Sequence, residues 1–161
     1  MPEGWSVVRG VLPAGIAGAT DWRTNTVYVD PRYRPVVQRC TLTHELVHVE
    51  RGPSLAPQYD APEELVVRKI AARRLIDIRE LGEALAESDS LGHVSDVLHV
   101  DHDTLMIRLK YLHPAERAYL RRRLEHDEHQ HPATDRTEDA AGCCASPGPD
   151  CPECGHWDQC S

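Results

Sequence analysis

The sequence RCTLTHELVHVERG at residues 39–52 predicts an apolar helix that carries two histidines one turn apart. We expect this helix to run from about Pro35 to Glu50, because Gly52 and Pro53 stop it. Apolar residues surround the histidine pair and would bury the rest of the helix. A helix held in the core in this way is the support that a preorganised metal site requires.

His44 and His48 are four residues apart, which places both imidazoles on one face of the helix. Two nitrogens at this spacing suit one Zn²⁺ ion with Zn–N distances of about 2.0–2.1 Å. Glu45 lies roughly 100° further round the helix and can face a zinc-activated water without binding the metal. We therefore predict a catalytic zinc bound by His44 and His48, with Glu45 as the general base.

A catalytic zinc usually has a third protein ligand on another element. Glu63 and Glu64 open the next expected helix, which runs from Asp60 to about Glu80. Glu63 follows Asp60 by three residues, as in a capping box, and so has a competing role at the helix start. Glu64 leads the apolar face of this helix. We predict Glu64 as the third ligand, with Glu63 as the second candidate.

Residues upstream of the histidine helix are typical of short strands. Apolar stretches at 5–12 and 15–19 precede the alternating sequence TVYVD at 26–30. We expect a small antiparallel sheet with a hairpin centred near Arg23 to Asn25, and hence an α+β fold. We also expect the strand from Thr26 to Asp30 to be an exposed edge that could accept a substrate peptide by strand addition.

The C-terminal half of the domain is expected to be helical. Short helices near 93–98 and 102–112 have the outline of a helix-turn-helix, and Pro114 opens a helix of about 12 residues. Local arginines make the region basic, which would suit contact with DNA or a repressor. The alternative is a helical subdomain that completes the core. We favour this alternative because the chain has a net charge of −8 and a pI of about 5.6.

Three parts of the chain differ in composition. Residues 1–125 form the expected metallopeptidase-type domain, 126–142 a flexible polar linker, and 143–161 a cysteine-rich tail. Cys151 and Cys154 form a CxxC pair, the usual knuckle of a structural zinc site. The remaining ligands of such a site are Cys144 and Cys160, for which Cys143 and His156 are alternatives. The other reading is a flexible tail of reactive thiols.

Two further roles concern single residues. Cys40 precedes His44 by one helical turn and could lie near the metal, although we expect a small buried thiol. Peptide hydrolysis also needs a group that stabilises the developing oxyanion. Tyr59, Tyr111, Tyr119 and the remaining histidines are candidates among which the sequence does not choose.

The composition also bears on location. No apolar run approaches the roughly 20 residues of a membrane helix, and the start MPEGWSVVRG lacks the features of a signal peptide. We expect a cytoplasmic protein. The six cysteines are then expected to be thiols or metal ligands rather than disulfides.

The two helical stretches together resemble a known family. RCTLTHELVHVERG at 39–52, followed by EELVVRKIAARRLI at 63–76, is similar to the ImmA/IrrE-like metallopeptidases, and especially to short versions in phages of actinobacteria. Glu64 fits the first position of the family pattern E-x-x-A-x-x-F-A-A. Val67 and Ile70 depart from the pattern but keep the apolar face. The resemblance covers about residues 10–125 and is strongest over the histidine helix.

The resemblance implies an HExxH…E zinc site in a compact zincin-like fold. It also implies an endopeptidase that cuts a helix-turn-helix repressor encoded near it and so controls phage or stress genes. The expected partner is thus a protein, without direct nucleic-acid binding. The rival is a non-catalytic DNA- or repressor-binding module that retains a structural metal site. Glu45 distinguishes the two, since only an enzyme needs that carboxylate.

Overall fold

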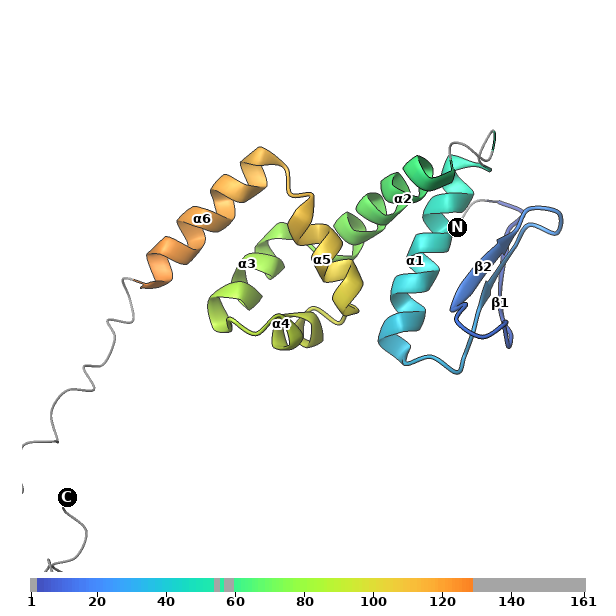
Figure 1. Cartoon of the computed structure of the whole chain (residues 1–161), viewed down its shortest axis with the longest axis horizontal. Coiled ribbons are helices and arrows are strands. Elements are labelled where there is room, and N and C mark those ends of the chain that lie inside the picture. The colour runs from blue at the N-terminus through green and yellow to red at the C-terminus, as the bar shows by residue number, and fades with distance from the viewer. Residues whose placement is uncertain (1–2, 54–55, 57–59, 129–161) are drawn as a thin grey trace, which may run out of the picture. The chain divides into compact units, whose positions relative to one another are not determined.

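The computed structural model describes residues 3–53, 56 and 60–128 (Figure 1). Within them the chain forms an α+β fold in which three strands precede six helices. The strands are β1 (Ser6–Arg9), β2 (Gly18–Asp21) and β3 (Thr26–Val29). The helices are α1 (Pro35–Arg51), α2 (Asp60–Leu75), α3 (Ile78–Glu87), α4 (Leu91–Val97), α5 (His102–Lys110) and α6 (Pro114–Glu128). No helix in the described part of the chain is both long and apolar enough to cross a membrane.

The chain divides into two units, Met1–Gln130 and His131–Ser161. All the described residues belong to the first unit. Helix α6 continues to Glu128, so the backbone at 126–128 is helical rather than part of the predicted linker. The remainder of that linker and the cysteine-rich tail lie outside the described residues.

The small sheet has the order β1-β3-β2 and is mixed, whereas we predicted an antiparallel sheet. β2 and β3 form the expected antiparallel hairpin, but β1 pairs with β3 in parallel. Asp30, directly after β3, accepts a hydrogen bond from the Leu12 backbone N–H at 2.9 Å and donates its own N–H to Ala17. These bonds fix the segment between β1 and β2 across the end of β3, which places β1 and β2 on opposite sides of it.

β3 is the central strand, so the prediction of an exposed edge from Thr26 to Asp30 was wrong. Both sides of β3 are hydrogen-bonded to neighbouring strands, and Val27 and Val29 are buried. Alternating β-branched residues indicate a strand with one buried face, and this pattern occurs in central and edge strands alike. The outer strands of the sheet are β1 and β2.

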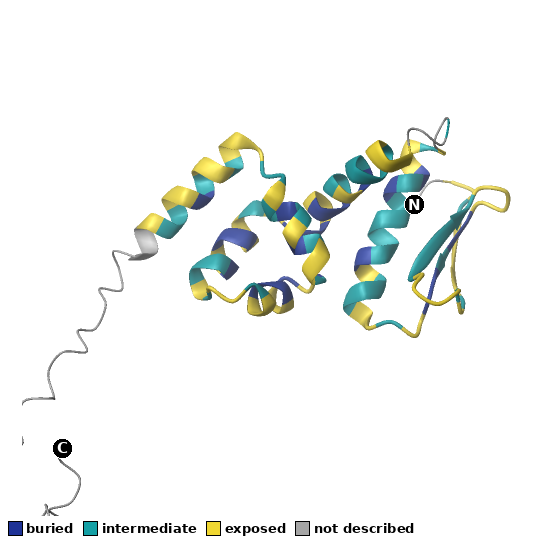
Figure 2. Cartoon of the chain, viewed as in Figure 1, coloured by how far each residue is buried: buried dark blue, intermediate teal, exposed yellow. Residues whose placement is uncertain are grey.

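Helix α1 packs on the sheet and continues close to its predicted bounds. Val49 of α1 joins Val27 and Val29 in a core cluster with Trp5 and Leu42 at its margin. Figure 2 shows the dark blue ribbon of β3 in the sheet beside this helix.

Gly18 marks the closest approach of β2 to α1. A Cβ atom at this position would overlap the Thr41 Cγ2 atom and would lie 3.3 Å from Glu45 Cγ. The absence of a side chain therefore allows the strand to lie directly against the helix that carries the histidines.

Helix α2 packs against α1 and ends earlier than predicted. Val67 and Ala71 of α2 form a core cluster with Val47 of α1. We expected α2 to reach about Glu80, but it ends at Leu75 and a separate helix begins at Ile78. The reason is Asp77, whose carboxylate accepts the Arg79 N–H and caps α3.

The main core lies among α2 to α6. Its largest fully buried side chains include Ile76, Leu81 and Leu105. Gly82 lies inside α3, where Leu120 and Tyr119 of α6 pack closely over it. Gly82 thus serves helix packing rather than helix termination.

Helices α4 and α5 follow the predicted short-helix, turn and longer-helix order. His99 in the turn has φ of 53°, and the Asp101 carboxylate caps α5 by accepting the Thr104 N–H. Arg108 of α5 is buried and donates hydrogen bonds to the Ile76 carbonyl and the Glu116 carboxylate. This buried arginine thus links α5 to the neighbouring parts of the helical core.

Candidate metal centre

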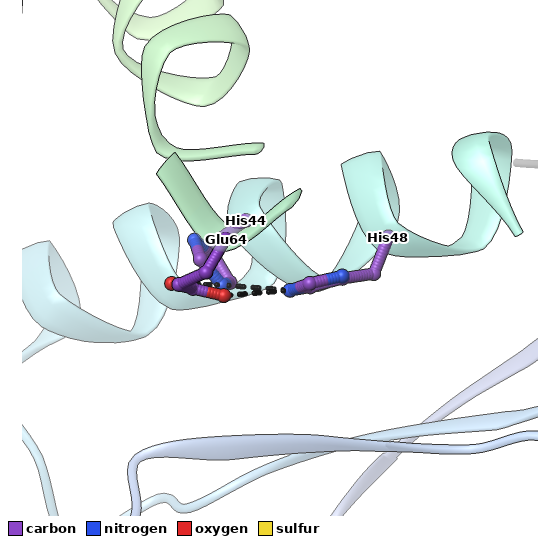
Figure 3. A group of neighbouring side chains, drawn as sticks. All are labelled: His44, His48 and Glu64. Carbon is purple, nitrogen blue, oxygen red and sulfur yellow. Dashed lines mark hydrogen bonds and ion pairs between the residues drawn. The ribbon is translucent and has the colours of Figure 1, made fainter. Parts of the chain in front are cut away.

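The two histidines lie on the half-buried face of α1. Val47 and Val49 of the same helix are buried, in contact with α2 and the sheet respectively. This packing fixes the rotation of α1 about its axis and directs His44 and His48 towards the start of α2. Figure 3 shows that Glu64 of α2 meets both imidazoles there.

The three side chains converge on one point. The Nε2 atoms of His44 and His48 are 3.1 Å apart, and the Glu64 carboxylate oxygens lie 3.3 Å and 3.2 Å from them. Ligand atoms around a tetrahedral zinc, with bonds of about 2.0–2.1 Å, are separated by roughly 3.3 Å. His44, His48 and Glu64 could therefore hold a metal ion, and their nitrogen and oxygen donors suit zinc.

The charges of the group support metal binding at neutral pH. Hydrogen bonds from His44 and His48 hold the pKa of Glu64 well below its usual range, so its carboxylate is ionised. The same contact with Glu64 raises the pKa of His48. Protons therefore compete with a metal for His48 as the medium becomes acidic, because a metal needs the neutral imidazole.

Glu45 lies next to His44 on α1 but is not one of the three converging side chains. The Thr20 hydroxyl of β2 donates a hydrogen bond of 2.7 Å to Glu45 Oε2. This contact restrains one carboxylate oxygen of Glu45. Sequence reasoning missed Thr20, since the expected strand ended at residue 19, whereas β2 extends through Asp21.

Two hollows adjoin the site. One, of about 360 Å³, is lined by His44 and Glu45 among others, and another, of about 450 Å³, by His48, Glu64 and Trp22. The side chains of His44 and His48 are 24% and 25% exposed, so solvent reaches both rings. A substrate could thus approach the three converging side chains from either side.

Glu63, the second candidate for the third ligand, has a different partner. Its carboxylate pairs with Arg51 of α1, which lowers the pKa of Glu63. A second pair links Glu50 of α1 to Arg74 of α2. These contacts hold α2 against α1, with Glu64 as the acid that faces the histidines.

The other predicted positions fall into three groups. Cys40 is buried and its sulfur accepts the Asp101 N–H at 3.4 Å, and burial raises the pKa of the thiol. Tyr111 lies under the Lys69 ammonium group at 4.1 Å, and Tyr119 packs over Gly82. Tyr59 lies outside the described residues, as do all the cysteines of the predicted second zinc site: Cys143, Cys144, Cys151, Cys154 and Cys160. The oxyanion-stabilising group stays unassigned.

Comparison of the chain with protein-family models, with curated proteins and with solved structures found no match. The functional argument for this protein therefore rests on the geometry of its own residues.

Proposed function

We propose that this protein is a zinc-dependent endopeptidase with a zincin-like catalytic domain. The observation that carries the proposal is the convergence of His44, His48 and Glu64, in which each pair of side chains approaches to 3.3 Å or less. Glu45 beside them adds a carboxylate that a purely structural metal site does not need. A small sheet, a histidine helix and a second helix that brings an acid form the minimal framework of such a site.

His44, His48 and Glu64 would hold the zinc, leaving a further position open to water and substrate. A bound zinc ion would supply a Lewis acid that acidifies water and polarises the scissile carbonyl. Glu45 takes a proton from the attacking water and passes it to the departing amine nitrogen. The Thr20 hydrogen bond at 2.7 Å fixes the orientation of this carboxylate during both transfers.

The proposed substrate is another protein, a helix-turn-helix repressor or similar regulator. This step rests on the likeness of residues 39–52 and 63–76 to the ImmA/IrrE-like metallopeptidases. Cleavage of a repressor at one site would release the genes that it controls.

The substitution Glu45→Gln tests catalysis directly. Glutamine keeps the shape and can still accept the Thr20 hydrogen bond, but it cannot take a proton. We expect the variant to bind zinc normally and to lose a factor of about 10²–10⁴ in turnover, the usual contribution of a general base. The measurement compares new protein N-termini by mass spectrometry in bacterial cells that express the wild-type or variant chain with repressors encoded beside its gene.

Cleavage products that occur only with the wild-type chain support the proposal. Identical N-termini from the two zinc-loaded proteins would instead favour the rival, a repressor-binding module with a structural metal.

A further inference from the structure

We propose that Arg68 binds a carboxylate of the substrate in the hollow beside His44 and Glu45. This inference rests on the proposed function and specifies the chemical class of substrate that the site accepts.

The position of Arg68 relates it to the metal centre. Arg68 follows Glu64 by four residues on α2, so the two side chains leave the same face of the helix. Arg68 also lines the same hollow as His44 and Glu45. A substrate bound at the metal would therefore have part of its length within this arginine's hollow.

The Arg68 side chain forms no hydrogen bond or ion pair with the other described residues. Its neighbours differ in this respect. Arg73 and Arg74, on the same helix, pair with Glu116 and Glu50. The exposed guanidinium of Arg68 is thus free to form a bidentate contact with an incoming carboxylate.

Three acidic residues also line the hollow, and two of them have other contacts. Glu45 accepts the Thr20 hydroxyl hydrogen bond, and Asp101 caps α5 through the Thr104 N–H. Asp103 lies in the first turn of α5, where the helix dipole stabilises its negative charge. A carboxylate ligand therefore competes mainly with Asp103 for Arg68, and a cationic ligand is the alternative that an experiment must include.

The hollow has room for a substrate side chain. Its volume is about 360 Å³, and small residues such as Gly18, Ala71 and Ala72 form part of its wall. Since a water molecule occupies roughly 30 Å³ of liquid, the space admits a group of several non-hydrogen atoms. The carboxylate could be an acidic side chain next to the scissile bond or the terminus of a peptide.

Binding of peptide hydroxamates to the zinc-loaded full chain tests this assignment without the need for turnover. The hydroxamate group chelates zinc and holds each probe at the metal. Three probes differ only in the adjacent side chain, which ends in a carboxylate, a carboxamide or an ammonium group. A fourth has the carboxamide side chain and a free terminal carboxylate. Dissociation constants are measured by calorimetry for the wild type, for Arg68→Glu and for Arg121→Glu, an exposed control on α6.

We expect a carboxylate probe to bind wild-type protein about tenfold more tightly than the carboxamide probe. The reason is that a hydrogen bond to a charged group contributes more free energy than a hydrogen bond to a neutral group. Arg68→Glu should abolish this preference and favour the ammonium probe, with the carboxamide probe unaffected. Arg121→Glu should match the wild type. Tighter binding of the fourth probe alone would identify a terminal carboxylate as the ligand.

Equal binding of all probes to the zinc-loaded chain would overturn the role of Arg68 and leave the metal site intact. A wild-type preference for the ammonium probe, or a carboxylate preference that survives in Arg68→Glu, would overturn it as well. A chain that binds neither zinc nor any probe would reject the proposed function, and the inference with it.

Discussion

Glu45 and Thr20 come from different elements, and their hydrogen bond connects the edge strand β2 to the histidine helix. An isolated carboxylate on the surface of a helix samples several rotamers. The Thr20 hydroxyl restricts Glu45 to one of them, 2.7 Å away. In the proposed mechanism Thr20 is therefore a positioning residue that acts through Glu45.

Replacing Thr20 with valine tests this role. Valine keeps the branched shape but removes the hydroxyl, so Glu45 loses its restraint while the metal ligands are unchanged. We expect kcat to fall on the order of tenfold, in line with the loss of one hydrogen bond to a charged group, with KM and zinc content unaltered. Thr20→Ser keeps the hydroxyl and should retain most of the activity in the same steady-state assay. Equal losses in the valine and serine variants would show that the methyl group, not the hydrogen bond, matters.

The sequence predicted the residues that can hold the metal but did not predict Thr20, the residue that orients Glu45. His44, His48 and Glu64 could be identified because the helical period relates residues four apart and because an acid at a helix start has few positions to occupy. Thr20 could not be identified, since its contact with Glu45 spans 25 residues and depends on the extent of a short strand.

Strand β2 and helix α1 approach closely at Gly18, and this contact sets the distance between Thr20 and Glu45. The substitution Gly18→Ala would place a methyl group against Thr41 Cγ2, which belongs to a β-branched side chain with little rotameric freedom. We expect the free energy of unfolding to fall by about 1–3 kcal/mol, as for other overpacked sites. Chemical denaturation measures this change.

Gly10→Ala is the matched control, because a Cβ atom there meets only Tyr28 at an ordinary 3.8 Å. Thr41→Ser removes the obstructing methyl group and should recover part of the loss when combined with Gly18→Ala. Additive effects of the two substitutions would contradict a direct clash between them.

Glu116 links α6 to the rest of the helical core. It accepts hydrogen bonds from the buried Arg108, from Arg73 of α2 and from the His113 N–H. The pKa of Glu116 is lowered from 4.5 to about 2, mainly because its carboxylate accepts hydrogen bonds from Arg108. The unfolded chain therefore takes up this proton at a higher pH than the folded chain does.

The contribution of Glu116 to stability should be present above pH 4.5 and should disappear as the pH falls towards 2. Unfolding of the wild type and of Glu116→Gln, followed at several pH values without added metal, measures it. We expect the wild type to be the more stable near neutral pH and the difference to shrink in acid. A difference that does not depend on pH would exclude an ionic role for this carboxylate.

The sequence predicted the positions of the helices more accurately than the pairing of the strands. The apolar run around the histidine pair located α1, and the outline of a short helix, a turn and a longer helix located α4 and α5 within a few residues. The mixed sheet could not be predicted, because a strand of four residues with one apolar face can pair in either direction. The hydrogen bonds of Asp30 that fix β1 beside β3 are tertiary contacts without a local signal.

For the whole molecule, the α+β character and the helical C-terminal part of the first unit agree with the prediction, and the sheet topology does not. The net charge of −8 led us to favour a helical subdomain that completes the core, and Arg108 is buried and paired in that part of the chain. The described unit contains every residue of the proposed catalytic mechanism, so residues 1–130 should suffice for metal binding.

The most direct test of the central claim is the zinc content, by elemental analysis, of fragment 1–130 as wild type, His44→Ala and Glu45→Gln. This fragment lacks the tail cysteines, so the predicted cysteine zinc site does not contribute to the measurement. The account predicts one zinc ion per chain in the wild type and in Glu45→Gln, and none in His44→Ala. A wild-type fragment that binds no zinc, or a His44→Ala variant that keeps it, would contradict the proposed metal centre.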